Sequence, residues 1–392
     1  MERVPLVFLK ALPTPSGQSA VDLWSEPLTA ALAGNGPALV PVPDGPAGAA
    51  ITKMARLDEP LEVPDAALVV PTSGSTGVPK GALLTRSALR ASSLATLDRI
   101  GGPGGWLLAL PVTHIAGLNV LTRAVLGNGP TVAMDLADGF TPEGFVAATQ
   151  RLHAVRRYTA LVPTQLSRLL DGGGGEAIAA LASYDAVLLG GAAASPELLK
   201  RAAAVGATIT TTYGMSETCG GCVYDGVPLD GVLVDLDEGR IALGGDSVFS
   251  GYRLRPDLTA EALEVREGVR WHLTRDAGRW ADGRLDILGR IDDMITTGAE
   301  KVAPLAVESA LAALPGIREA VVIGVPDDEW GQAVAAVVTA DREFTLDEIR
   351  DALRPALPGY ALPRRLLVLD RIPLIGTGKP DRIGLRNSFL SP

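Results

Sequence analysis

Residues 71–81 combine the residue types that bind phosphate groups. They read Pro-Thr-Ser-Gly-Ser-Thr-Gly-Val-Pro-Lys-Gly. Glycines let successive backbone N–H groups point into one concavity, the hydroxyls add donors, and Lys80 supplies a positive charge. The predicted phosphate-binding residues of this loop are Thr72, Ser73, Gly74, Ser75, Thr76, Gly77 and Lys80. The sequence therefore predicts a protein that binds a nucleotide.

The spacing within this loop differs from that of the P-loop in kinases and GTPases. That pattern places a Gly-Lys pair before Ser or Thr, whereas here two residues separate Gly77 from Lys80 and a glycine follows the lysine. A phosphoryl-transferring kinase is therefore disfavoured. A solvated Ser/Gly linker is the other alternative. The loop, however, follows an apolar strand-like run at 66–70 and precedes a helix-like segment at 87–97.

The elements that would position this loop alternate between strands and helices. The strand-like runs are 66–70, 106–110, 159–162, 186–189 and 207–211, with helix-like segments at 165–170 and 196–204 between later ones. This alternation predicts an α/β fold with mostly parallel sheets covered by helices. Because ligands collect at the carboxyl ends of parallel strands, we expect the loops that follow the five runs to share one edge.

The character of the sequence changes near Gly289. Beyond it we predict a helix at 308–314, strands at 320–325 and 333–338, a helix at 346–356 and a strand at 365–369. This is the pattern of a small α+β domain. We therefore predict two domains, residues 1–289 and 290–392.

Composition limits the classes of function. The chain has 392 residues, 47% of them apolar, and carries 35 basic and 45 acidic residues without a basic block. We expect a globular protein that does not bind nucleic acid. No apolar run approaches the ~20 residues that span a bilayer, and the N-terminus shows no signal peptide. With only two cysteines, these features predict a cytoplasmic location.

The phosphate loop and the later segment 213–218, Tyr-Gly-Met-Ser-Glu-Thr, resemble the adenylate-forming superfamily of acyl-CoA synthetases, adenylation domains and luciferases. The resemblance implies that Tyr213 packs on adenine and that Glu217 helps to hold Mg²⁺ between phosphate groups. An aromatic face and a hard oxygen ligand suit a metal–nucleotide complex. Taken alone, the segment would more commonly be a buried tyrosine and a surface glutamate.

Further nucleotide contacts are implied by the same resemblance. They are assigned to Gly190, Gly191, Ala192, Thr212, Gly214, Met215, Ser216, Asp276 and Arg290. Asp276 matches the family aspartate that accepts both ribose hydroxyls, although Arg275 replaces the usual glycine before it. Segment 289–298 resembles the hinge between the family's domains, with Asp292 as its pivot. An exposed Arg-Asp pair and an ordinary charged turn are the structural alternatives.

The resemblance also implies residues that act on the acid. Lys379 matches the catalytic lysine of a mobile C-terminal domain, where a flexible cation neutralises charge at the reacting centre. The implied catalytic residues are Lys379, His114 and Glu217, and the implied acid-binding residues are His114, Arg123, Gly190, Gly214 and Thr218. Arg123 could bind a second, distal carboxylate through its guanidinium fork. A core histidine, a surface arginine and a tail lysine are the alternatives.

Cys219-Gly-Gly-Cys222 raises the question of a zinc or redox site. Structural zinc needs four ligands, and the sequence offers neither a second cysteine pair nor histidines at ligand spacing. We therefore disfavour metal binding and disulfide exchange. We expect the two glycines to line the acyl pocket.

Within the superfamily, segments 110–118, 158–166 and 213–224 resemble the o-succinylbenzoate:CoA ligases of menaquinone biosynthesis, in their actinobacterial form. Only seventy residues precede Pro71, so we expect a shortened N-terminal subdomain. Thr113 and the segment 296–299 also depart from the family pattern. These departures leave open a related aryl acid from specialised metabolism.

The resemblance implies an ATP-dependent, Mg²⁺-assisted reaction in two halves. The acid forms an acyl-adenylate with release of pyrophosphate, the small domain rotates, and coenzyme A (CoA) displaces AMP. A stand-alone adenylation enzyme that loads a carrier protein remains an alternative. A catalytically silent adenylate-binding sensor would have lost Lys379 or Glu217, and both are present. The resemblance also implies that the protein forms a homodimer.

Overall fold

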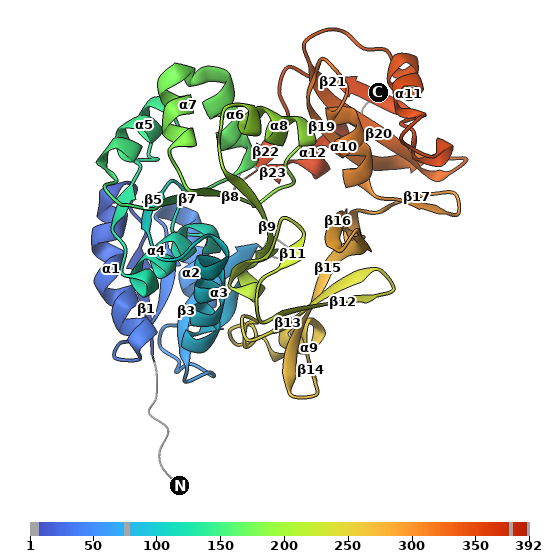
Figure 1. Cartoon of the computed structure of the whole chain (residues 1–392). Coiled ribbons are helices and arrows are strands. Elements are labelled where there is room, and N and C mark those ends of the chain that lie inside the picture. Colours follow the sequence, from blue (N-terminus) through green and yellow to red (C-terminus); the bar gives the residue numbers. More distant parts are fainter. Residues whose placement is uncertain (1–7, 74–78, 376–378, 390–392) are drawn as a thin grey trace. The chain divides into compact units, whose positions relative to one another are not determined.

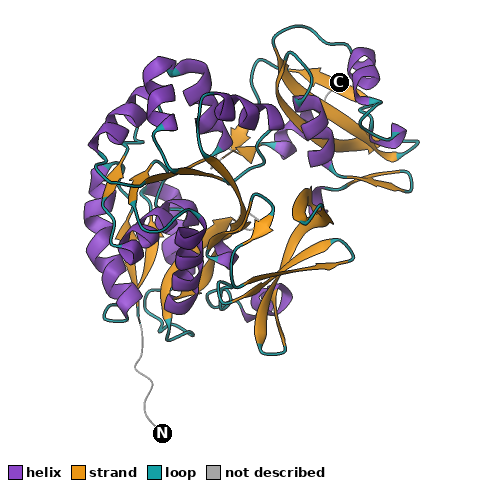
Figure 2. Cartoon of the chain, viewed as in Figure 1, coloured by secondary structure: helices purple, strands orange, loops and turns teal. Residues whose placement is uncertain are grey.

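Strands and helices alternate through the first half of the chain, as the apolar runs predict. The computed structural model describes residues 8–73, 79–375 and 379–389. Figure 2 shows the strands of this region in orange among purple helices. A seven-stranded sheet has the order β11-β10-β9-β8-β7-β5-β6, and its pairs are parallel from β6 to β9. Its strands are β5 (Gly105–Leu108), β6 (Thr131–Ala133), β7 (Arg157–Leu161), β8 (Ala186–Leu189), β9 (Ile209–Met215), β10 (Gly220–Tyr224) and β11 (Val227–Pro228). The predicted α/β fold is confirmed.

One expectation about this sheet is wrong. The strand before the phosphate loop belongs to a separate four-stranded sheet of order β1-β2-β3-β4. Its strands are β1 (Leu9–Pro13), β2 (Ala38–Val42), β3 (Ala66–Ser73) and β4 (Pro79–Thr85). β3 pairs with β4 in antiparallel fashion on one side and with β2 in parallel on the other, so neither of its edges remains for β5. The five loops therefore do not share one sheet edge.

Helices fill the space between and around these two sheets. α1 and α3 pack on strands of the first sheet, and α4 packs on β5 and β7 of the second (Figure 1). Leu68, Leu84, Trp106, Leu118 and Leu188 belong to one continuous core that includes both sheets. The helices of this region are α1 (Gln18–Ala33), α2 (Gly45–Ala55), α3 (Arg86–Arg99), α4 (Ile115–Gly127), α5 (Pro142–Arg151), α6 (Pro163–Gly172), α7 (Gly174–Ala182) and α8 (Pro196–Ala204).

A mostly antiparallel sheet follows, for which the apolar runs gave no signal. Its order is β12-β13-β15-β14, with β16 paired to β15. The strands are β12 (Val232–Asp237), β13 (Arg240–Gly245), β14 (Leu263–Arg266), β15 (Val269–Ala281) and β16 (Arg284–Arg290), and α9 (Pro256–Ala262) lies before β14. Exposed and half-buried side chains alternate along β12, as expected for a sheet with one solvated face.

The C-terminal part is a small α+β structure, as predicted. Its main sheet has the order β18-β17-β20-β19, and β21 pairs with β20. The elements are β17 (Ile295–Thr297), β18 (Glu300–Val302), α10 (Pro304–Ala312), β19 (Ile317–Asp327), β20 (Gly331–Ala340), α11 (Leu346–Leu353), β21 (Arg365–Val368), β22 (Leu374–Ile375), β23 (Lys379–Pro380) and α12 (Arg382–Ser388). Val307, Val322, Val334 and Ile349 are completely buried in its core.

The chain divides into two compact units. The first comprises Met1–Ala194, Arg201–Asp235 and Ala242–Thr274, and the second comprises Ser195–Lys200, Leu236–Ile241 and Arg275–Pro392. The division therefore falls within α8, β12, β13 and β15. A functional boundary at Gly289/Arg290 stays a prediction. Of the helices that the structure describes, none has the length and apolarity needed to cross a membrane.

Candidate active site

The β3–β4 hairpin holds the stems of the predicted phosphate loop. Thr72 and Lys80 are register partners, and the Thr72 hydroxyl lies 3.4 Å from the Lys80 carbonyl oxygen. Ser73 ends β3, and its side chain is outside the described part of the structure. The predicted residues Gly74, Ser75, Thr76 and Gly77 also lie outside the described residues. The hairpin thus fixes where the loop begins and ends.

Lys80 and Glu217 meet at one tyrosine. The Lys80 ammonium donates a hydrogen bond to the Tyr252 hydroxyl at 2.6 Å, and that hydroxyl donates to Glu217 Oε1 at 2.6 Å. Lys80 Nζ lies 3.6 Å from the same carboxylate oxygen and 3.9 Å from the centre of the tyrosine ring. The structure therefore brings together the lysine predicted for phosphate and the glutamate predicted for metal.

Backbone pairing sets this geometry. Segment 249–253 runs along β4: the Arg253 N–H donates to the Gly81 carbonyl at 2.8 Å, and the Leu83 N–H donates to the Gly251 carbonyl at 2.9 Å. The Phe249 N–H donates to the Glu217 carbonyl at 2.8 Å. One segment thus connects the strand that carries Lys80 with the short helical turn η1 (Ser216–Thr218) that carries Glu217.

Glu217 suits a magnesium ion that is held mainly by nucleotide. Its side chain is 9% exposed, and a carboxylate is the oxygen ligand that Mg²⁺ accepts. Among the described residues, no group of three or more His, Cys, Asp and Glu side chains could form a complete metal cage. Mg²⁺ usually takes one or two carboxylates, substrate phosphates and water, so a single glutamate beside the phosphate loop fits this group.

Two of the predicted nucleotide- and acid-binding residues, Gly190 just after β8 and Gly214 on β9, are glycines at positions where a Cβ atom would clash with neighbouring atoms. A Cβ at Gly190 would lie 2.4 Å from the Thr212 hydroxyl oxygen, and one at Gly214 would lie 2.1 Å from the Gly220 carbonyl oxygen. Tyr213 precedes Gly214 on β9, and its side chain is half-buried. Gly191 and Ala192, after β8, are exposed. The nucleotide-binding roles of these residues stay predictions.

Thr218 and its neighbours close the turn after β9. The Thr218 hydroxyl donates to the Gly220 carbonyl at 2.7 Å and accepts from the Met215 N–H at 3.0 Å. Ser216 begins the helical turn. These bonds satisfy the hydroxyl of the buried Thr218 within the protein. A contact between Thr218 and the acid stays a prediction.

Helix α4 and its N-cap residue provide two of the predicted acid-binding residues, His114 and Arg123. His114 is its exposed N-cap residue, and Arg123 follows nine positions later. Arg123 is only 4% exposed, so the alternative of a surface arginine is wrong. Its Nη2 donates to the Tyr224 hydroxyl at 3.3 Å, and the guanidinium lies 5.6 Å from the Trp106 ring centre. Buried Nε has no hydrogen-bond partner among the described residues.

The glycines of β10 allow α4 to approach closely. A Cβ at Gly220 would lie 2.0 Å from Asn119 Nδ2, which donates to the Cys219 carbonyl at 2.8 Å. Asn119 stands one turn before Arg123 on α4. Gly221 and Cys222 also line a cavity of about 210 Å³ against α3. Whether the acyl group lies against these glycines stays a prediction.

The two cysteines are buried and form no disulfide within the described structure. Burial raises the pKa of the Cys222 thiol to about 12 and raises the pKa of the Cys219 thiol still further from its usual value. Both thiols are therefore protonated at neutral pH. Since the thiolate is the metal ligand and nucleophile, this arrangement favours two packing residues.

We expect both thiols to resist alkylation in the folded protein. Because burial raises both pKa values, the thiolate fraction stays negligible from pH 7 to pH 9, and iodoacetamide labelling should be slow throughout this range. Mass spectrometry of peptides after timed labelling measures the effect. Labelling in denaturant is the positive control. Fast labelling of the native enzyme would show that a thiolate is present and accessible.

The predicted ribose and hinge residues lie in the second unit. Asp276 on β15 is the register partner of Arg290 on β16. Arg290 donates to Asp292 Oδ2 at 2.9 Å, and Arg275 reaches the same oxygen at 3.3 Å. Partial burial raises the pKa of the Asp292 carboxyl, but the bonds from Arg290 and Arg275 outweigh it and lower the pKa overall. Arg275, which replaces the expected glycine, thus supports the carboxylate of the predicted pivot.

Lys379 begins β23 and pairs in register with Ile375 of β22. Its side chain and residues 376–378 lie outside the described part of the structure. The backbone pairing places Lys379 within the two-stranded sheet β22-β23 of the second unit. Its catalytic role stays a prediction.

Comparison with known proteins agrees with the motifs. Residues 12–253 match the AMP-binding enzyme family, and residues 306–379 match the AMP-binding enzyme C-terminal domain. A probable 2-succinylbenzoate–CoA ligase of Mycobacterium tuberculosis is 45% identical, over 97% of this chain and 98% of that protein. A feruloyl-CoA synthase of Amycolatopsis is 33% identical, over 85% of this chain and 72% of that protein.

The fold has solved counterparts. An o-succinylbenzoate CoA synthetase of Bacillus subtilis, in complex with its acyl-adenylate intermediate, superposes with a TM-score of 0.74 at 24% identity, over 97% of this chain and 88% of that chain. The two family matches, the full-length relative and the shared fold agree with one another. This chain belongs to the AMP-binding enzyme family, the adenylate-forming enzymes.

Proposed function

We propose that the protein is an ATP-dependent ligase that converts o-succinylbenzoate into its CoA thioester and releases AMP and pyrophosphate. The observation that carries the choice of acid is the buried guanidinium of Arg123. A buried charge costs several kcal/mol unless a partner compensates it. Among the described residues no carboxylate forms an ion pair with Arg123, and its Nε lacks a hydrogen-bond partner. A second carboxylate on the substrate would supply both.

Relatives support the same acid. Proteins named 2-succinylbenzoate–CoA ligase occur at 45% identity over nearly the full chain and at 31% identity in Enterococcus faecalis. We propose that the guanidinium binds the carboxylate that does not react. The other carboxylate would lie toward His114, at the start of the same helix.

In the first half-reaction, the reacting carboxylate oxygen bonds to the α-phosphorus of ATP, and the bond to the β-phosphate oxygen breaks. We assign Lys80 and the hydroxyls of the phosphate loop to the departing pyrophosphate, and Glu217 to Mg²⁺. When bound, Mg²⁺ shields the negative charge of the phosphates. We assign Lys379 to charge that develops at the carboxylate and α-phosphate. Asp276 and Arg290 would hold the ribose.

In the second half-reaction, the CoA sulfur bonds to the acyl carbon, the bond to the AMP oxygen breaks, and the thiol loses its proton. We propose that the C-terminal domain rotates about Asp292 between the halves, so that Lys379 leaves and CoA enters. Because ATP and CoA are metabolites of the cytoplasm, we place the reaction there. By analogy with the family we also propose a homodimer, which sedimentation analysis would test.

The products provide the direct test. Incubation with ATP, Mg²⁺, CoA and o-succinylbenzoate should yield a mono-CoA thioester, AMP and pyrophosphate in equal amounts, as measured by mass spectrometry. Omitting CoA should stop the reaction at the acyl-adenylate. ADP as the product would contradict the proposal, because a kinase transfers a phosphoryl group and leaves ADP. Failure with o-succinylbenzoate but turnover of another acid would keep the mechanism and change the substrate.

A second acid deserves the same assay. The feruloyl-CoA synthase relative favours a monocarboxylic aryl acid such as ferulate. An acid of that class would leave Arg123 unpaired, so we expect a much lower kcat/KM than with the dicarboxylate. A preference for ferulate over o-succinylbenzoate would select this alternative.

A further inference from the structure

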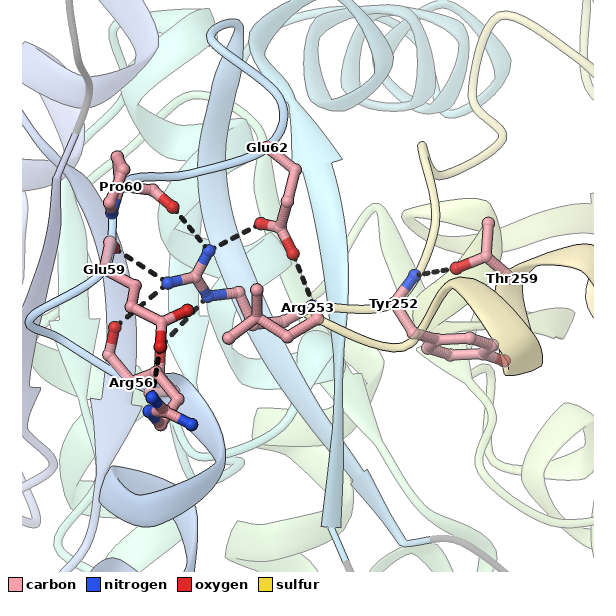
Figure 3. Close-up of polar contacts among 9 residues, drawn as sticks. Arg56, Glu59, Pro60, Glu62, Tyr252, Arg253 and Thr259 are labelled. Carbon is pink, nitrogen blue, oxygen red and sulfur yellow. Dashed lines mark hydrogen bonds and ion pairs between the residues drawn. The ribbon is translucent and has the colours of Figure 1, made fainter.

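Arg253 is a buried arginine whose five N–H donors are all satisfied (Figure 3). Its side chain has no solvent exposure. Four backbone carbonyls and one carboxylate accept its hydrogen bonds at 2.6 to 3.0 Å. The acceptors are the carbonyls of Ala55, Arg56, Glu59 and Pro60, and the carboxylate of Glu62. We call this set the Arg253 anchor.

The anchor joins Arg253 and Leu254 to residues 55–62. Ala55 is the last residue of α2, where unpaired helix carbonyls attract a cation. The second oxygen of Glu62 accepts the Leu254 N–H. Since the planar guanidinium offers its donors in a rigid fork, five acceptors determine both its position and its orientation. The other three carbonyls come from residues 56–60, a segment whose role the sequence did not indicate.

Tyr252, next to Arg253, points the other way. Figure 3 shows the Arg253 side chain directed to its acceptors at 55–62 and the Tyr252 ring directed away from them. The Tyr252 hydroxyl instead bonds to Lys80 and Glu217. The Tyr252 N–H donates to the Thr259 hydroxyl at 2.9 Å, as Figure 3 shows. Its ring packs edge-on against Phe249 at 4.8 Å between centres. The hydroxyl therefore has little freedom to move.

We propose that Tyr252, held by the Arg253 anchor, is a positioning residue for the metal–nucleotide complex. This inference rests on the proposed function, in which Lys80 binds phosphate and Glu217 binds Mg²⁺. The two charges lie 3.6 Å apart with the hydroxyl bonded to both. Without that hydroxyl they can close to a direct ion pair of ~2.8 Å, which is strong in a partly buried site. Lys80 would then be less available to phosphate, and Glu217 would be less available to Mg²⁺.

The test is the binding of MgATP and AMP to Tyr252→Phe, measured by calorimetry. Losing a hydrogen-bonded bridge between charged groups should raise the Kd for MgATP about tenfold. AMP lacks the β- and γ-phosphates, so its Kd should stay within about twofold of wild type. Equal weakening of both nucleotides, or an unchanged Kd for MgATP, would overturn the proposal. Because no acid is present, the result does not depend on the identity of the substrate.

Tyr184→Phe is the matched control. Tyr184 is also buried, and its hydroxyl forms a 2.8 Å hydrogen bond with the Thr149 hydroxyl on α5. Removing the Tyr184 hydroxyl should lower the melting temperature as much as removing the Tyr252 hydroxyl, without changing the Kd for MgATP. A control that weakens MgATP as strongly as Tyr252→Phe would count against the proposal.

Glu62→Gln tests the anchor and avoids leaving a buried guanidinium without most of its partners. We expect a smaller rise in the Kd for MgATP, about threefold, because one charged acceptor of Arg253 becomes neutral. Asp171→Asn, which removes the exposed ion pair with Arg201, is the matched control and should have no effect. A lower melting temperature with unchanged MgATP binding in Glu62→Gln would refute the part assigned to the anchor.

Discussion

Lys379→Ala should lose adenylate formation by a factor of about 100 to 1,000 while it retains thioester formation from supplied acyl-adenylate. The lysine is proposed to act where charge develops at the carboxylate and α-phosphate. The second half-reaction begins from the finished adenylate and does not require a cation at the carboxylate and α-phosphate. Substitution of a single electrostatic contact should therefore separate the two steps.

Two assays measure this separation. Pyrophosphate release with ATP and o-succinylbenzoate reports the first step, and thioester formation from synthetic acyl-adenylate and CoA reports the second. Lys53→Ala is the control, since Lys53 is an exposed lysine of α2 outside the proposed machinery. If Lys379→Ala slows both steps equally, the lysine serves the fold or both reactions, and the assignment fails.

Arg123→Ala should raise the KM for o-succinylbenzoate about 100-fold with little change in kcat. Removing one partner of a buried charge pair costs ~2–5 kcal/mol, and an interaction that is equal in the ground and transition states affects KM alone. A monocarboxylic analogue makes no such contact. Its KM should stay within a few fold of the wild-type value.

Steady-state kinetics with both acids decides this prediction, and Arg123→Lys provides the conservative comparison. Lysine keeps the charge but lacks the planar fork of donors that binds a carboxylate through both oxygens, so an intermediate KM is expected. Arg123 also packs against Trp106 and Tyr224, so the melting temperature of each variant must be recorded. Equal effects on the two acids would remove Arg123 from the acid-binding site.

Local hydrophobic patterns were enough to predict many strands and helices of the fold. The strand at 186–189 and the helix at 196–204 were predicted at the bounds that the structure shows, because a short, wholly apolar run and an amphipathic helix leave direct periodic traces. The antiparallel strands after 231 left none. β12 combines aspartates with apolar residues and is half-buried on one face, so its composition resembles that of a loop.

Tertiary pairing explains what the sequence did not reveal about the site. Lys80 and Glu217 each lie in a motif, but Tyr252 joins them from a segment without one. The Gly-Tyr-Arg sequence at 251–253 offered the only local hint, a glycine followed by residues rich in donors. The sequence also did not reveal which sheet contains β3. An apolar run does not specify its partner strands, and only the structure shows that β3 pairs with β4 and β2.

The distance along the chain between Lys80 and Tyr252, 172 residues, has a consequence for biosynthesis. The ribosome makes the chain from its N-terminus, so the phosphate loop emerges long before its tyrosine, and the carbonyls at 55–60 emerge before Arg253. Contacts this distant form only after most of the first unit has been translated. A nascent chain that stops short of residue 253 should therefore be unable to retain ATP, although its phosphate-binding motif is complete.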